Sequence, residues 1–203
     1  MNAPGGPEWL VREDAAPSTL VALHVRQVLG IRAPHELPAL RDVPGSTLVR
    51  DTAEQAELER QWLAYWALTV EPQAHPSPVP LDLVDGFETL VALPTEGFDL
   101  LAEQMRPHAA SAVDYAHTAH GRYRTRIDAT SATSYRAYAS ALAQYERRIG
   151  RRAHSFELNV QVLPLAQRGL WWIGSLTIAV TDGLRGDAVA FDSAIAPIIA
   201  EIA

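Results

Sequence analysis

The chain has 203 residues and a formal net charge of −7, and it contains neither cysteine nor lysine. The absence of cysteine excludes thiol nucleophiles, disulfides, iron–sulfur clusters and cysteine-ligated zinc. The absence of lysine excludes Schiff-base chemistry and a phosphate-loop lysine. The N-terminus lacks the basic start and apolar run of a signal peptide, and no apolar stretch reaches the roughly 20 residues of a membrane span. We therefore expect a soluble, cytoplasmic protein.

The first half of the chain predicts two helices and a long loop. Ser18 is a suitable N-cap and Gly30 a suitable stop for a first helix. Residues 31–50 contain three prolines and a glycine and are expected to form a loop. Asp51 or Thr52 then caps a second helix that runs to about Thr69 and carries a bulky aromatic face.

A proline-rich stretch, residues 72–80, follows the second helix. We expect one domain over residues 1–203, and this stretch is the best candidate for a subdivision into a helical part, 1–71, and an α+β part, 81–203. Residues 81–94 contain Asp85-Gly86, which favours a hairpin between two short strands, although a short helix fits as well.

The middle of the chain predicts helices around one strand. Residues 97–105 and 107–120 have helical patterns separated by Pro107, and Gly121 is expected to end the second. Residues 122–127 alternate arginine with other residues, which is the period of a strand. The clearest helix covers residues 133–149, where apolar and aromatic residues recur every three or four positions: Tyr135, Tyr138, Leu142, Tyr145 and Ile149.

The last third predicts a β-hairpin and a terminal helix. Residues 154–163 alternate apolar and polar side chains, which predicts a strand. After a loop of hairpin length, residues 170–181 are expected to form the second strand of the hairpin. Asp187 can cap a final helix that extends to about Ile202 and contains Pro197. Helices packed on a small, mainly antiparallel sheet give an α+β fold.

No strong catalytic or nucleotide-binding motif is present, and no cofactor is predicted. One weak signal for a metal is the spacing of Asp114, His117 and His120, since helical neighbours three apart can share an ion. On a helical wheel, however, Asp114 and His120 are about 120° apart, so a further ligand, such as His75 or His154, would be needed. A solvated helix surface explains the same residues.

A second weak signal is a run rich in arginine within an acidic chain. Residues 104–156 hold nine arginines and three acidic residues. The candidate anion-binding residues within it are Arg122, Arg124, Arg126, Arg147, Arg148, Arg151 and Arg152. Arginine suits phosphate or carboxylate ligands, but pairing with the acids of residues 1–103 explains the run equally well. The acidic balance of the whole chain disfavours nucleic acid as a partner.

The aromatic side chains point to self-association. Trp171 and Trp172 are adjacent on a predicted strand, so one of them faces away from the core. The leading hypothesis is a non-enzymatic or cryptic binding protein that forms a dimer. The alternatives are a protein that binds a small anion through the arginines and a metal-dependent enzyme that uses the Asp/His cluster.

Overall fold

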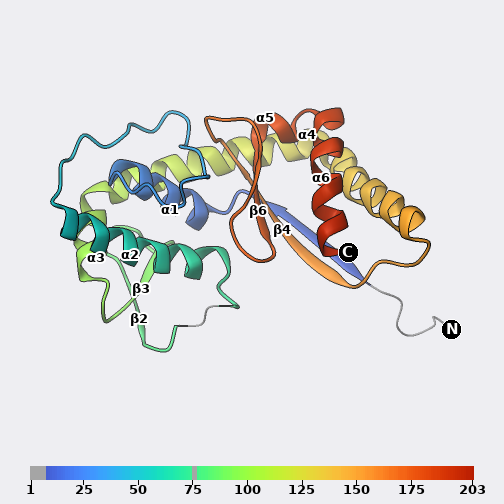
Figure 1. The fold of residues 1–203 in the computed structure, drawn as a ribbon. Helices are drawn as coiled ribbons and strands as arrows, with labels where there is room; N and C mark the ends of the chain where they lie inside the picture. The colour runs from blue at the N-terminus through green and yellow to red at the C-terminus, as the bar shows by residue number, and fades with distance from the viewer. Residues whose placement is uncertain (1–7, 75–76) are drawn as a thin grey trace. The chain divides into compact units, whose positions relative to one another are not determined.

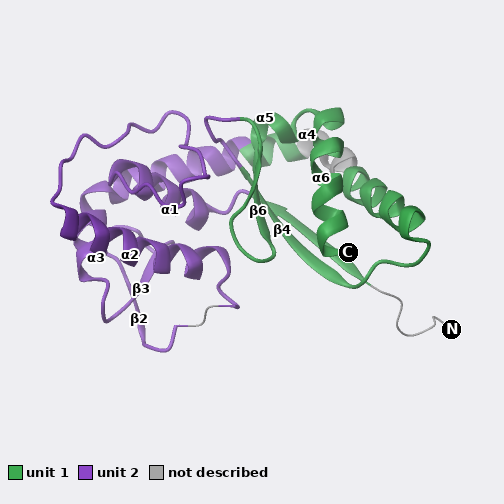
Figure 2. Ribbon diagram, viewed as in Figure 1, with its two compact units in different colours: residues 1–14, 123–162, 168–203 green, residues 15–122, 163–167 purple. Residues whose placement is uncertain are grey.

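The computed structural model describes residues 8–74 and 77–203, and within residues 128–134 it describes the backbone only. The chain divides into two compact units (Figure 2). Unit 1 comprises Met1–Asp14, Tyr123–Val162 and Arg168–Ala203, and unit 2 comprises Ala15–Arg122 and Leu163–Gln167. Helices and strands are mixed along the chain (Figure 1), so the predicted α+β class is confirmed.

Unit 2 is built on helices α1 (Pro17–Val28), α2 (Thr52–Val70) and α3 (Asp99–Met105). The α2 cap is as predicted: Asp51 accepts hydrogen bonds from two first-turn amides, which otherwise have no helical partner. The predicted cap of α1 is wrong, because Ala16 occupies that position and Pro17 supplies the first-turn backbone geometry. In the core, Trp62 is fully buried and donates from its indole nitrogen to the Ala22 carbonyl, 3.1 Å away.

Side chains of α1 and α2 hold the loop at residues 31–50, among them the buried Arg26 of α1. Arg26 donates to five backbone carbonyls between residues 32 and 38, at 2.8–3.2 Å. Glu59 of α2 accepts from the amides of Arg32 and Ala33 at the start of the same loop. These bonds satisfy backbone groups that a loop without secondary structure leaves open.

The predicted hairpin at residues 81–94 is confirmed. Strands β2 (Leu81–Leu83) and β3 (Ala92–Pro94) pair antiparallel, and Gly86 in the turn has a φ of 85°, which favours glycine. The proline-rich stretch that precedes this hairpin lies inside unit 2 together with both of its flanks.

Helix α4 is longer than predicted, and it includes residues 122–127, so the strand predicted there is wrong. After the 3₁₀ turn η1 (Arg106–His108), α4 runs from Ala109 to Ile149. Gly121 does not end it, and residues 122–127 are helical. The arginine alternation at 122–127 matches a strand in spacing, but Tyr123 is the buried residue of this segment and fits the small apolar helix face of Ala112 and Ala116. Gly150, with a φ of 71°, follows the helix end as predicted.

Unit 1 contains a four-stranded sheet in the order β1-β4-β6-β5. Its strands are β1 (Trp9–Asp14), β4 (Phe156–Leu163), β5 (Leu170–Trp172) and β6 (Thr177–Thr181). Two details differ from the sequence prediction. The expected strand at 170–181 turns back on itself as the antiparallel pair β5–β6, and β1, which was not predicted, pairs parallel with β4.

Helices α5 (Asp182–Arg185) and α6 (Ala188–Ile202) complete unit 1. Asp187 caps α6 as predicted by accepting from the Ala190 amide, and Pro197 lies inside the helix. On α6 the buried Phe191 meets Tyr138 of α4 edge to face, with ring centroids 5.7 Å apart. Of the helices in the described part of the chain, none has the length and apolar content needed to cross a membrane.

Candidate functional site

Strand β1 is an edge strand whose outer backbone groups face away from the sheet. The Phe156 amide of β4 donates to the Glu8 carbonyl, so the even-numbered residues of β1 direct their backbone groups towards β4. In a strand these directions alternate, so Trp9, Val11 and Glu13 direct theirs outward. The Val11 carbonyl confirms this, since the Tyr135 hydroxyl approaches it from outside at 3.5 Å.

The two faces of β1 have different surroundings. The parallel register places Trp9 and Val11 beside Phe156 and Leu158, on the buried face of the sheet. Leu10 and Arg12 lie on the opposite face, where Leu10 is 40% exposed and Arg12 pairs with Glu157 at 2.6 Å. On this face the strand therefore offers an apolar and a charged side chain to solvent.

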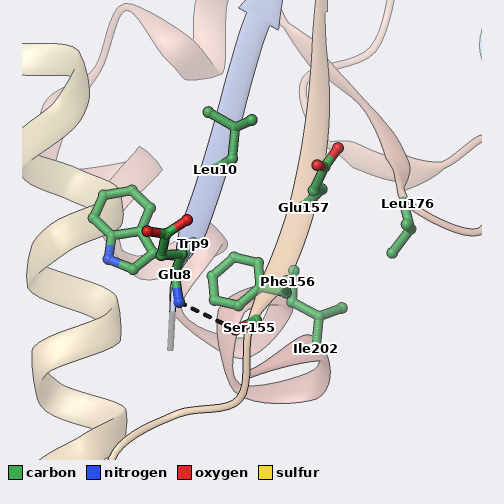
Figure 3. Close-up of a pocket in the computed structure, with 8 residues that line it drawn as sticks. All are labelled: Glu8, Trp9, Leu10, Ser155, Phe156, Glu157, Leu176 and Ile202. Atoms are coloured by element: carbon green, nitrogen blue, oxygen red, sulfur yellow. Dashed lines mark hydrogen bonds between the residues drawn. The ribbon is translucent and has the colours of Figure 1, made fainter. Parts of the chain in front are cut away.

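An open cavity of about 930 Å³ adjoins the start of β1 (Figure 3). Its lining mixes apolar and acidic side chains and consists of Glu8, Trp9, Leu10, Ser155, Phe156, Glu157, Leu176 and Ile202. Within this lining the Glu8 amide donates to the Ser155 hydroxyl, 3.1 Å away (Figure 3). The lining carries two carboxylates, Glu8 and Glu157, and one hydroxyl, Ser155.

The far end of β1 is anchored by a buried ion pair. The Glu13 carboxylate accepts from the Arg185 guanidinium and from the Tyr138 hydroxyl, both at 2.8 Å. Side chains of Glu13 and Arg185 are only 12% and 14% exposed. The guanidinium also lies over the Phe191 ring, 4.5 Å from its centroid, while its Nη2 atom has no hydrogen-bond partner among the described residues.

The tyrosines around this ion pair are held neutral. Burial raises the pKa of Tyr138 far above its ordinary value, and the nearby Glu13 charge raises it further. Burial likewise raises the pKa of Tyr123, and the charges of Glu13 and Asp14 raise it further. A neutral phenol donates a hydrogen bond but does not act as a base, so the cluster is suited to fixing β1 in place rather than to proton transfer.

A buried histidine in unit 2 is also neutral. His24 of α1 is 4% exposed, and its ring centroid lies 5.6 Å from that of Tyr115. Burial lowers the pKa of His24 to about 4, and the charge of His108 contributes to the same direction. Its Nδ1 atom has no hydrogen-bond partner among the described residues.

The three residues of the predicted metal cluster lie on α4 and differ in exposure. Asp114 and His117 are exposed, and His120 is half-buried, with its Nδ1 atom 2.9 Å from the Ala15 carbonyl. Within residues 8–74 and 77–203, no group of three or more histidine and carboxylate side chains could hold a metal ion. His154 is exposed, and His75 lies outside the described residues.

The seven arginines of the predicted anion site are all exposed. Because 122–127 is helical, Arg122 and Arg126 share one side of α4, while Arg124 points in a different direction. Arg126 pairs with Asp182 at 2.9 Å, and the Arg148 guanidinium lies 5.4 Å from the Tyr145 ring centroid. Asp182, the acid of this pair, lies on α5, outside the acidic first half of the chain.

The edge strand and its anchor were not found from the sequence. The signal that could have found β1 is the apolar triplet Trp9, Leu10 and Val11, which has high strand propensity and lies between two prolines. No local pattern marks Glu13 or Arg185 as partners, because 172 residues separate them in the chain. The two adjacent tryptophans do lie on a strand: Trp171 is half-buried and Trp172 is 37% exposed. No family model, curated protein or solved structure matches this chain.

Proposed function

We propose that this chain is a non-enzymatic, cytoplasmic binding protein that self-associates, and that its binding surface is the outer edge of β1. The observation that carries this proposal is the place of β1 at the end of the strand order, with the Leu10 side chain 40% exposed on it. An unpaired strand edge is a template for a further strand, which is why proteins use such edges for recognition.

The other groups in unit 1 support a binding role over catalysis. The buried carboxylate of Glu13 is committed to two donors, and the neighbouring tyrosines are neutral. These contacts hold the edge in a defined position. A rigid edge binds an added strand at a lower entropic cost than a mobile one.

The experiment removes one outward amide. Val11→Pro deletes an N–H that points away from β4, so no bond within the sheet is lost, and proline is tolerated at the free side of an edge strand. Val11→Ala is the matched control, because it also loses the valine side chain but keeps the amide. We expect light scattering at micromolar concentrations to show a dimer for the native chain and Val11→Ala, and a monomer for Val11→Pro.

Thermal melts of both variants check that unit 1 still folds. A native chain that stays monomeric at every concentration contradicts the proposal. So does a Val11→Pro variant that melts like the control and still forms the native dimer.

A further inference from the structure

We infer that the arginines at the end of α4 bind a compact anion that carries several phosphate groups. This α4-end cluster consists of Arg147, Arg148, Arg151 and Arg152, and all four side chains are exposed. None of them belongs to β1 or to the cavity beside it, so the proposed function can fail without this site failing.

The structure divides the arginines of the predicted anion site into separate groups. Residues 122–127 lie in the middle of α4, and Arg147 follows Arg126 by 21 positions of the same helix. At a rise of about 1.5 Å per residue, these two arginines are roughly 30 Å apart along the helix. A single compact ligand therefore cannot contact both, and Arg126 is already neutralised by Asp182.

The α4-end cluster has no direct neutralisation by carboxylates. Other arginines of unit 1 form ion pairs, for example Arg12 with Glu157. Among the side chains that the structure describes, no ion pair involves a member of the α4-end cluster. Glu146 is adjacent in sequence, but its Oε1 atom accepts from the Ala153 amide at 3.0 Å. The four guanidinium groups therefore repel one another until an anion binds.

The backbone that carries the cluster is held in place. Gly150 has a φ of 71° and turns the chain at the helix end, where its amide donates to the Glu146 carbonyl at 2.9 Å. Ala153 is buried, and the His154 amide donates to the Ala203 carbonyl at 2.7 Å. The arginines thus extend from a fixed turn, so a ligand needs to order only their side chains.

The helix dipole explains part of this cluster. Arg147 and Arg148 lie in the last turn of α4, where the negative end of the dipole stabilises cations. The Arg148 guanidinium also lies over the Tyr145 ring, 5.4 Å from its centroid. Arg151 and Arg152 follow Gly150 outside the helix, and the hydrogen bond described for their side chains is local, from Arg151 to the Arg152 carbonyl at 3.1 Å. A ligand therefore explains this second pair better than helix stability does.

The chemistry of the cluster selects the class of anion. Guanidinium groups bind phosphate oxygens through paired N–H donors. Adjacent phosphate groups place several negative charges close together, which suits several neighbouring guanidiniums better than one carboxylate does. The chain carries a net charge of −7, so a long polyanion would meet repulsion beyond the cluster. We therefore expect clustered phosphates, either in a small soluble molecule or in a lipid headgroup.

Two binding measurements distinguish these sources. Calorimetric titration with tripolyphosphate tests the soluble source, with sodium chloride at equal ionic strength as the control for screening. Sedimentation with phosphatidylcholine vesicles that contain an inositol bisphosphate lipid tests the headgroup source. We expect saturable binding of the native chain in at least one measurement, with a dissociation constant of roughly 10–100 µM.

Variants of the second arginine pair test the assignment to this cluster. Arg151→Gln/Arg152→Gln should weaken binding about tenfold, because two of the four cationic groups are lost. The matched control, Arg124→Gln/Arg136→Gln, removes the same charge from exposed positions of α4 outside the cluster and should bind within about twofold of native. Arg151→Lys/Arg152→Lys keeps the charge but loses the paired donors, so it should bind about threefold more weakly.

The outcomes that overturn this site are specific to it. They are the absence of saturable binding in both measurements, or equal weakening by Arg151→Gln/Arg152→Gln and by the matched control, which would show a general effect of charge. A single-stranded oligonucleotide that binds as tightly as tripolyphosphate, at equal phosphate concentration, overturns the compact ligand. None of these results depends on whether the chain forms a dimer.

Discussion

At the scale of single residues, burial decides the chemistry of the ionisable groups. His24 is a clear case, because the surrounding apolar side chains disfavour its charged form. The sequence places this histidine on the apolar first helix but contains nothing that shows its Nδ1 atom to lack a partner. That property depends on the packing of α1 against Tyr115, which is distant in the chain.

The low pKa of His24 predicts a loss of stability in mild acid. The unfolded imidazole titrates near 6.5 and the folded one near 4, so the unfolded state binds more protons between these values. The contribution of neutral His24 is fully present above pH 6.5 and is lost as the pH falls towards 4. Between pH 7 and 4.5 the native chain should lose about 2 kcal/mol of unfolding free energy from this group.

Urea unfolding at the two pH values measures the effect, with His24→Phe as the comparison. The variant should lose less stability than the native chain, by the amount assigned to the imidazole. Equal losses in both proteins would show that His24 is not the group responsible.

At the scale of elements, β1 is held by side chains from helices that lie far from it in sequence. Glu13 of β1 meets Arg185 of α5 and Tyr138 of α4, and Phe191 of α6 supports the guanidinium. The helices α2 and α6 and the 81–94 hairpin were predictable, because capping residues, helical periodicity and turn residues are local. The strand at 122–127 was not, because alternation over six residues is too short to distinguish a strand from the middle of a long helix.

The anchor of β1 predicts a strong coupling between Glu13 and Arg185. Arg185→Met leaves a mostly buried carboxylate with one donor, and Glu13→Gln leaves a mostly buried guanidinium without its counter-charge. Each single variant should lose about 3 kcal/mol of unfolding free energy. The double variant should lose clearly less than the sum, because it leaves no unpaired charge.

Urea denaturation of the four proteins completes this double-mutant cycle. Additive losses would mean that the two side chains stabilise unit 1 independently. In that case the ion pair would not be what fixes the end of β1.

At the scale of the whole molecule, the α+β class could be predicted and the binding surface could not. Composition and local periodicity give the class. The surface depends on β1 lying at the edge of the sheet, which results from its parallel pairing with β4 across about 147 residues of chain. The arginine run and the Asp/His spacing are local patterns in the sequence. Among the described residues, Asp114, His117 and His120 do not form a group that could hold a metal ion.

The most direct measurement of the central claim is amide hydrogen exchange within β1 at low and high protein concentration. The amides of Leu10 and Arg12 point towards β4 and should be protected at both concentrations. The Trp9 amide points outward from a half-buried residue, so it should exchange rapidly in the dilute protein and slowly in the concentrated one. A Trp9 amide that exchanges at the same rate at both concentrations would contradict self-association through this edge.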